Sequence, residues 1–269
     1  MSLLALQSMP KTDLAELQVV LTDIDDTLTL HGRLPAVAYG ALERLQSVGI
    51  KVVAVTGRPA GWCDHIARMW PVDGVVGENG AFYFHYEQST RRMRRVYAQD
   101  LAMRQGNTKK LRAIAEDIIL EFPGTAWASD QAYREIDVAI DFAEDVLPLP
   151  LAVAQKIADS FHRRGAAAKV SSIHVNAWFG DHDKLTMCLR MLAEVFDIDG
   201  NKDNRKIAYL GDSPNDAPMF SHFRNGIGVA NLLPFVPLMT DLPRYITLGE
   251  GGRGFAEFTD AVLATKVLM

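Results

Sequence analysis

Buried strands and amphipathic helices alternate along the first third of the chain. Residues 17–23 form a continuous apolar run rich in β-branched side chains, typical of a strand buried on both faces of a parallel sheet. Residues 34–48 repeat apolar positions at helical spacing, and residues 50–57 are a second buried strand. Residues 60–69 are again helical, and 72–81 contain a third short strand. This βαβαβ order predicts an α/β domain with a doubly wound, Rossmann-like parallel sheet.

The pattern changes after Ala81, where apolar and polar residues alternate and one face of the sheet is therefore expected to be solvated. The expected elements are a hairpin over 82–97, helices over 109–122 and 150–164, and strands over 135–141, 166–171 and 172–178. They predict an inserted α+β cap domain at 83–182. Buried strands resume at 206–212 and 226–230, so the predicted core comprises residues 1–82 and 183–269.

Composition and charge exclude several classes of partner. Hydrophobic residues make up 48% of the 269 residues, and a net charge of −5 is spread along the chain. We therefore expect no nucleic-acid face and no membrane patch. The first ten residues lack the features of a secretory signal, and no apolar run approaches the roughly 20 residues of a membrane span. A cytoplasmic protein with small-molecule partners is predicted, in which Cys63 and Cys188 are buried and reduced.

Two acidic strings follow buried strands. The string DIDDT begins at Asp23, where the first strand ends, and the string GDSPND at 211–216 ends another strand. Open α/β sheets form their ligand crevices at the carboxyl ends of strands. Taken alone, the first string also fits a turn with an Asx cap, and Ser213 with Pro214 also fits a simple helix start.

Together these strings resemble the motifs of the haloacid dehalogenase superfamily. Its four motifs would fall at Asp23 with Asp25, at Thr56, at Lys184, and at Asp212 with Asp216. The GENGA segment, which contains Asn79, and the inserted domain resemble the type IIB capped members. That branch includes sucrose-phosphate, mannosyl-phosphoglycerate and Cof-type sugar phosphatases and the phosphomannomutases. The resemblance covers nearly the whole chain from residue 17 and implies a phosphoric monoester hydrolase.

The residue types suit the chemistry that this resemblance implies. A carboxylate can approach an anionic phosphate ester only when cations neutralise the repulsion. Asp23 would attack phosphorus to form an aspartyl phosphate, Asp25 would be the general acid and then base, and Lys184 would balance the phosphoryl charge. Mg²⁺ is the implied cofactor. Its implied ligands are Asp23, the backbone carbonyl of Asp25, and Asp212, with Asn215 and Asp216 in or just behind the coordination shell.

Substrate-binding residues are predicted after the second strand and in the inserted domain. Thr56, Gly57 and Arg58 lie beside a helix N-terminus, where hydroxyl and N–H groups can hold phosphate oxygens. The same TGRP string is also an ordinary strand-to-helix turn, and a surface position is the alternative for Lys184. Asn79 and Arg134 complete the predicted set.

Other polar residues are less specific. Those that border apolar strands of the inserted domain and can reach a substrate are Gln131, Glu135, His174 and Asn176. The basic run Arg91, Arg92, Arg94 and Arg95 is interpreted as a solvated hairpin edge. His85 and His182 have no partner at ligand spacing, so no zinc site is expected.

The predicted function is Mg²⁺-dependent hydrolysis of a small phosphorylated metabolite, with sugar phosphate as the class that the resemblance implies. Asp25 favours phosphatase or phosphomutase chemistry, since the related ATPases and dehalogenases lack this residue. Two alternatives stay open: a phosphotransferase resembling phosphomannomutase, and a catalytically silent regulatory protein that binds sugar phosphate. The oligomeric state is left open.

Overall fold

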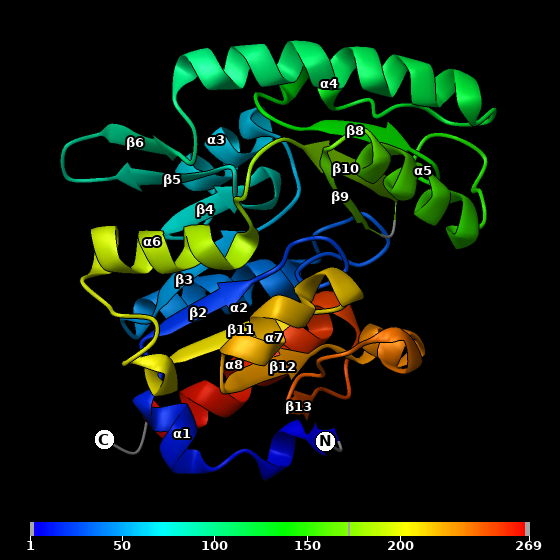
Figure 1. Cartoon of the computed structure of the whole chain (residues 1–269). Coiled ribbons are helices and arrows are strands. Elements are labelled where there is room, and N and C mark those ends of the chain that lie inside the picture. The colour runs from blue at the N-terminus through cyan, green and yellow to red at the C-terminus, as the bar shows by residue number, and fades with distance from the viewer. Residues whose placement is uncertain (1–2, 172, 267–269) are drawn as a thin grey trace.

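The computed structural model describes residues 3–171 and 173–266, which form two β-sheets covered by helices. Figure 1 shows the smaller sheet, with α4 and α5, above the larger one. The strands are β1 (Leu4–Ala5), β2 (Val19–Thr22), β3 (Lys51–Val55), β4 (Gly74–Gly77), β5 (Phe82–Glu87), β6 (Arg92–Tyr97), β7 (Ala126–Trp127), β8 (Val138–Asp141), β9 (Ala167–Val170), β10 (His174–Trp178), β11 (Ile207–Gly211), β12 (Asn225–Gly228) and β13 (Tyr245–Ile246). The helices are α1 (Lys11–Glu16), α2 (Ala36–Ser47), α3 (Ala60–Met69), α4 (Leu101–Glu121), α5 (Leu151–Arg163), α6 (Lys184–Phe196), α7 (Ala217–His222) and α8 (Gly251–Lys266).

The larger sheet confirms the predicted doubly wound architecture. Its strand order is β1-β13-β12-β11-β2-β3-β4-β5-β6, and neighbouring strands from β1 to β4 are parallel. The chain runs from β2 to β3 and β4 on one side, and later returns through β11 on the other side of β2. The direction of winding therefore reverses at β2. In open α/β sheets this reversal places a crevice at the carboxyl ends of the strands.

Helices cover both faces of the central strands. Successive side chains of a strand point to opposite faces. Val20 and Val52 accordingly pack in a cluster with α1, α2, α3 and α8, whereas Val19 and Val53 pack with α6 and α7. This burial on both faces is the physical reason for the continuous β-branched runs in the sequence.

The hairpin β5–β6 corrects one prediction. β5 pairs antiparallel with β4, and β6 pairs with β5 and forms an edge of the larger sheet. The sequence analysis placed this hairpin in the inserted domain, because an alternating hairpin carries no local sign of the sheet that it joins. Phe82 and Phe84 instead pack in the core of the larger sheet. We refer to residues 101–178, from α4 to β10, as the inserted module.

The inserted module is a four-stranded antiparallel sheet in the order β7-β8-β10-β9, with α4 and α5 on one face. Val138 and Ile140 of β8 and Val175 of β10 point into the apolar cluster beneath these helices. The intervening residues His174 and Asn176 point to the opposite face. That polar face is turned toward the carboxyl ends of the core strands, because both residues line a cavity there.

Helix α4 begins earlier than predicted, at Leu101 instead of residue 109. Asp100 caps it by accepting the N–H group of Met103 at 2.8 Å. Gly106 and Asn107 are weak helix formers, which hid the first two turns from the periodicity.

Two further expectations concern compartment. Within residues 3–171 and 173–266, no helix has both the length and the apolar character needed to cross a bilayer. Cys63 and Cys188 are free and buried as predicted, and burial raises the pKa of both thiols. The cytoplasmic location stays a prediction.

Candidate active site

Three strand ends bring the predicted motifs together. Asp23 follows β2, Thr56 follows β3 and Asp212 follows β11. β2 lies between β3 and β11 in parallel register, so the three residues lie at one edge of the sheet. The N–H group of Asp23 donates to the carbonyl oxygen of Leu210 at 2.9 Å, which holds the first acidic loop against β11.

Three buried carboxyl groups form an acidic cluster at this edge. Oxygen atoms of Asp23, Asp212 and Asp216 lie within 4.8 Å of one another, and each residue is at most 5% exposed. Burial raises the pKa of Asp23 to about 8, with Lys184 lowering it and Asp216 raising it. Burial, together with the charge of Asp23, raises the pKa of Asp212 well above its ordinary value. Burial and mutual repulsion therefore oppose the ionisation of this cluster, and a bound cation would favour it.

Lys184 is a buried cation in contact with this cluster. Its Nζ lies 2.7 Å from Oδ1 of Asp23 and 3.1 Å from Oδ1 of Asp216. It is the first residue of α6, which Asp183 caps by accepting the N–H group of Thr186 at 2.7 Å. Burial disfavours the charged ammonium, but Asp216 and Asp23 more than offset this effect, so the pKa of Lys184 is raised. The ammonium is therefore held charged against the Asp23 carboxylate.

The GENGA segment allows α6 to begin at this position. Gly80 has a φ of +100°, and a Cβ there would lie 2.0 Å from the carbonyl oxygen of Asp183. Both the conformation and the close approach require glycine.

Asp216 has both carboxylate oxygens engaged. Oδ1 accepts hydrogen bonds from Lys184 and from the hydroxyl of Tyr209. Oδ2 accepts the N–H groups of Asp212 and Ser213 at 3.2 and 3.3 Å. Asp216 therefore positions Lys184 and the acidic loop after β11.

The acidic cluster fits a hard divalent cation. Three buried carboxylates face one ammonium, and carboxylate oxygens are ligands that Mg²⁺ prefers. Oδ1 of Asp212 accepts the hydroxyl of Thr27 at 3.2 Å, which orients this carboxylate. Asn215 lines the adjoining cavity. The charge and the donor atoms thus suit Mg²⁺, and the assignment of individual ligands stays a prediction.

Asp25 pairs with Arg58 at the inserted module. The Nε atom of Arg58 lies 3.0 and 3.1 Å from the two carboxylate oxygens of Asp25. The same guanidinium contacts Glu144 at 3.0 Å and Asp130 at 3.5 Å, both in the inserted module, and lies over the ring of Trp62. Arg58 therefore connects the predicted general acid to the inserted module.

A cavity of about 40 Å³ lies between the core and the inserted module. The core lines it with Asp23, Asp25, Gly57, Arg58, Asn79, Asp212, Ser213 and Asn215, and the module with Arg134, Lys169, Ser171, Ile173, His174 and Asn176. Thr56, Lys184 and Asp216 lie behind this lining, and the buried hydroxyl of Thr56 accepts the N–H group of Arg58 at 2.9 Å. The structure thus gathers the predicted residues around one cavity, while their individual roles stay predictions.

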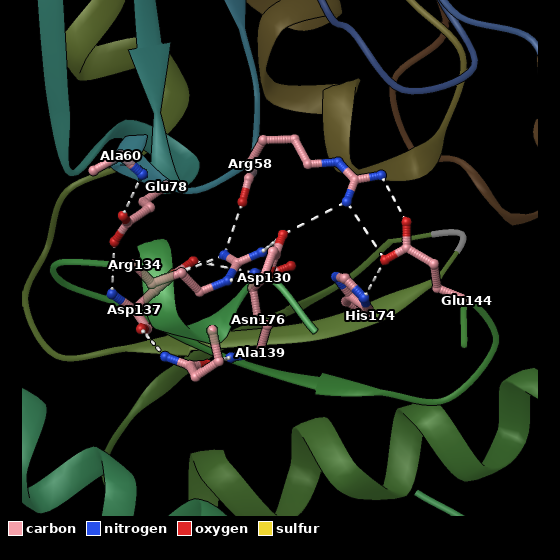
Figure 2. Close-up of polar contacts among 12 residues, drawn as sticks. Arg58, Ala60, Glu78, Asp130, Arg134, Asp137, Ala139, Glu144, His174 and Asn176 are labelled. Atoms are coloured by element: carbon pink, nitrogen blue, oxygen red, sulfur yellow. Dashed lines mark hydrogen bonds and ion pairs between the residues drawn. The ribbon is translucent and has the colours of Figure 1, made fainter. Parts of the chain in front are cut away.

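A buried polar network joins the core to the inserted module (Figure 2). The carboxylate of Glu78 in the core accepts four backbone N–H groups. Oε1 accepts those of Ala60 and Glu135, both at 2.9 Å, and Oε2 accepts those of Ile136 and Asp137 at 2.7 and 2.9 Å. Three of these donors belong to the module, so Glu78 anchors it.

Arg134, which the sequence analysis assigned to substrate binding, lies at the centre of this network (Figure 2). Its guanidinium pairs with Asp130 at 2.9 Å and Asp137 at 2.8 Å, and Nη1 donates to the carbonyl oxygen of Gly57 at 2.9 Å. Its side chain borders the cavity but is only 1% exposed. These contacts make Arg134 a connection between the module and the loop after β3.

Two comparisons of sequence agree with this geometry. A sequence model of the haloacid dehalogenase-like hydrolases matches residues 20–116. The chain is also 27% identical, over 250 residues, to the phosphoglycolate phosphatase of Methanopyrus kandleri, covering 91% of this chain and 97% of that relative. The chain is thus similar to haloacid dehalogenase-like hydrolases over residues 20–116, and to a phosphatase over most of its length.

Solved structures share the fold of this chain. A Thermoplasma acidophilum protein is similar with a TM-score of 0.69 at 16% identity, covering 92% of this chain and 98% of the other. The sucrose-phosphatase of Synechocystis sp. PCC6803, solved with sucrose and phosphate, is similar with a TM-score of 0.61 at 16% identity, covering 93% and 98%. These likenesses support the two-sheet architecture.

Some of the remaining residues predicted from the sequence line the cavity, and the others lie outside it. His174 and Asn176 line the cavity. Gln131 instead accepts the N–H group of Ala139, and the Glu135 side chain accepts hydrogen bonds outside the cavity. His182 is buried against Trp178, and His85 contacts a backbone carbonyl. The basic run is exposed: Arg91 lies in the turn before edge strand β6, and the other three arginines lie on β6. Arg94 pairs with Glu194 and Arg95 with Asp64, as expected for a solvated edge.

Sequence reasoning missed three residues at the interface of core and module. Glu78 is buried within the GENGA segment, and its backbone has a φ of +43°. Its position between two glycines was the only sign in the sequence of such an unusual backbone conformation. Glu144 pairs with Arg58 from a loop without periodicity. Lys169 lies between apolar residues of β9. This alternation, which indicates that Lys169 lies on the sheet face opposite the helices, is the signal in the sequence that could have found it.

Proposed function

We propose that the protein is a Mg²⁺-dependent phosphatase that hydrolyses a small phosphorylated metabolite through an aspartyl phosphate on Asp23. The observation that carries the proposal is the contact of the buried Asp23 carboxylate with Lys184 at 2.7 Å, at the floor of a cavity between two parts of the chain. A nucleophilic carboxylate needs a fixed cation that offsets the charge of the phosphoryl oxygens. Lys184 meets this need from behind the cavity lining.

The chain's own residues would divide the reaction between two steps. In the first, an oxygen of Asp23 bonds to phosphorus, the bond from phosphorus to the ester oxygen breaks, and Asp25 gives a proton to the leaving alcohol. In the second, Asp25 takes a proton from water, whose oxygen bonds to phosphorus, and the bond to Asp23 breaks to release phosphate. The position of Asp25 in the cavity lining supports this assignment.

The remaining groups would hold the phosphoryl group and the cofactor. Asp23, Asp212 and the backbone carbonyl of Asp25 would bind Mg²⁺, with Asn215 and Asp216 beside them. When bound, Mg²⁺ supplies charge neutralisation at the nucleophile and the phosphoryl oxygens. Thr56, Gly57, Arg58, Asn79 and Arg134 would bind or position the substrate from around the cavity. The inserted module would act as a cap that excludes water and selects the leaving group.

The relatives support a small phosphorylated substrate. The Methanopyrus kandleri relative is named for phosphoglycolate, and the Synechocystis protein was solved with sucrose and phosphate. Sugar phosphate is the class predicted from the sequence.

Release of phosphate from p-nitrophenyl phosphate and from a panel of metabolite monoesters tests the proposal. Turnover is expected with Mg²⁺, no turnover with EDTA, and none for Asp23→Asn. The matched control is Asp260→Asn, because Asp260 is exposed and pairs only with Arg44 at the surface among the described residues. Mass spectrometry of the quenched enzyme should find one phosphoryl group on Asp23.

The outcomes separate the alternatives. Isomerisation of a sugar phosphate without release of phosphate would show a phosphotransferase. Binding without turnover by the unmodified enzyme would show a silent regulatory protein. An active Asp23→Asn variant would disprove the assigned nucleophile.

A further inference from the structure

A second cavity adjoins the one beside the acidic cluster. Its volume is about 130 Å³, and it lies between the end of β10, the start of α6 and the start of α7. Asn79, Lys169 and Asn215 line both cavities, so the second space continues from the one that Asp23 and Asp25 line. The proposed reaction uses only the first cavity, and the second has no assigned occupant.

The wall that belongs to the second cavity alone is mainly apolar. Of the six residues that line this cavity and not the first, four are apolar: Trp178, Leu185, Pro218 and Met219. The other two are Lys184 and Asp183, which is exposed and caps α6 with its side chain.

The polar groups of Trp178 and Lys184 are already bonded within the protein. The indole N–H of Trp178 donates to the carbonyl oxygen of His182 at 3.2 Å. The ammonium of Lys184 contacts Asp23 at 2.7 Å and Asp216 at 3.1 Å. What these two residues can offer to a ligand in the second cavity is therefore an indole ring and a chain of methylene groups.

The core-facing side of β10 leads from the first cavity to the second. His174, Asn176 and Trp178 alternate with Val175 and Ala177, which pack beneath α4 and α5, so the first three residues point to the core. His174 and Asn176 line the first cavity, and Trp178, about 7 Å further along the strand, lines the second. The nucleophile lies in the core, so a leaving group has to point to the module. A leaving group that runs along β10 therefore reaches the second cavity.

The size of the second cavity limits what it can hold. A volume of about 150 Å³ is enough for a benzene ring in an apolar protein cavity, so about 130 Å³ accommodates five or six carbon atoms. On its outer side the cavity shares Lys169, Leu185 and Pro218 with an open groove on the surface. A longer chain would therefore pass out of the cavity into solvent.

The apolar wall selects against polar ligands. Burial of a methylene group is favourable, whereas burial of a hydroxyl group without a hydrogen-bond partner is costly. The hydroxyl groups of a sugar would meet the indole ring of Trp178 and the side chains of Leu185 and Met219 in this cavity.

We propose that the second cavity binds an apolar part of the leaving group, so that the substrate is the phosphate monoester of an alcohol with an alkyl or aryl segment of about six carbon atoms. This inference rests on the proposed phosphatase function and names the class of its leaving group. Trp178, Leu185, Pro218 and Met219 are specificity residues in this scheme and take no part in the transfer of the phosphoryl group.

A series of primary alkyl phosphates tests the inference. Ethyl, butyl, hexyl and octyl phosphate have leaving alcohols of nearly equal acidity, so differences in kcat/KM report the binding of the chain. From ethyl to hexyl phosphate, kcat/KM should rise about fourfold for each added methylene group, the value for full burial of that group. It should then level off toward octyl phosphate, whose last carbons lie in the open groove.

Two substitutions of Leu185 locate the chain. Leu185→Ser removes part of the apolar wall and should reduce the rise from ethyl to hexyl phosphate, and Leu185→Trp fills the cavity and should abolish it. The matched control is Leu189→Ser. Leu189 lies one turn further along α6, is half-buried like Leu185, packs on the same core cluster and lies outside the cavity lining. This control should keep the full rise.

The outcomes separate this inference from the proposed function. Equal kcat/KM for ethyl and hexyl phosphate in the unmodified enzyme would overturn the inference, as would a rise that persists in Leu185→Trp, which would place the chain elsewhere. Turnover of p-nitrophenyl phosphate in the same preparation shows that the proposed function stands even then. Calorimetry with Mg²⁺ and ethyl- or hexylphosphonate measures binding without turnover. Tighter binding of hexylphosphonate in a protein that hydrolyses none of the esters would refute the proposed function and support the apolar site.

Discussion

Glu78 offers a quantitative test of how the inserted module is held to the core. Its carboxylate is fully buried and accepts four backbone N–H groups at 2.7–2.9 Å. Burial raises the pKa of Glu78 to about 8. The four donors favour the ionised form, because each oxygen already accepts two N–H groups and a proton on either oxygen would displace one of them. Glu78→Gln separates these two effects.

The expected cost follows from counting donors. A glutamine in either orientation keeps one acceptor oxygen and turns an NH₂ group toward the other two N–H groups. Each buried N–H group left without an acceptor costs about 1–3 kcal/mol, so two cost about 2–6 kcal/mol. For a chain of this size each kcal/mol lowers Tm by about 2–4 °C, which predicts a fall on the order of 5–20 °C.

Thermal and urea unfolding at pH 7 would measure this loss, with Glu135→Gln as the matched control. Glu135 is the neighbouring acid, its side chain is 44% exposed, and it pairs with Arg104 at the surface, so its loss should cost less than about 1 kcal/mol. A Glu78→Gln variant as stable as the control would refute the reasoning. It would mean that Glu78 is protonated in the folded protein, since glutamine resembles the neutral acid.

Three further predictions concern the cavity and the residues that contact its lining. Hydrogen bonds from His174 and Arg58 lower the pKa of Glu144 from 4.5 to about 2, so its contribution to stability is present above pH 4.5 and lost as the pH falls through 2. Glu144→Gln should therefore unfold about 1–2 kcal/mol more easily in urea at pH 7, with the gap closing near pH 2. Asp25→Asn should lose about 100-fold or more in kcat on alkyl phosphates but much less on p-nitrophenyl phosphate, whose leaving group needs no proton; equal losses would contradict a general acid. Asp212→Asn should weaken Mg²⁺ binding about 10- to 100-fold in calorimetry, and an unchanged affinity would remove Asp212 from the metal site.

The core of the fold could be predicted because its signals are local. Strands buried on both faces need apolar side chains at successive positions, as in β2 and β11, and the acids that follow them mark the carboxyl edge of the sheet. The placement of the β5–β6 hairpin could not be predicted in this way. Its pairing with β4 is determined by tertiary packing, and the alternation of apolar and polar residues along the hairpin is equally compatible with either sheet.

The candidate site likewise contains residues whose placement could be predicted from the sequence and residues for which it could not. Asp23, Asp25 and Asp212 follow strands whose order is fixed by the doubly wound sheet, so their convergence could be predicted. Arg134 could not be understood from sequence, because its partners Asp130 and Asp137 are nearby acids that look solvated until the module packs on the core. The function of an interface residue depends on which face is buried, and that information is absent from the local pattern.

Charge explains why the reaction was easier to predict than the substrate. The core side of the cavity has four carboxylates from the two acidic strings, Asp23, Asp25, Asp212 and Asp216, and two cations, Lys184 and Arg58. With all four ionised, four negative and two positive charges leave two negative charges. Burial opposes this ionisation at Asp23 and Asp212, and a divalent cation would offset that effect before an anionic ester could approach. These charges come from motifs at strand ends, so the sequence indicates phosphoryl chemistry. The leaving group would instead meet the module face, and only the packing of the module on the core shows which side chains line that face.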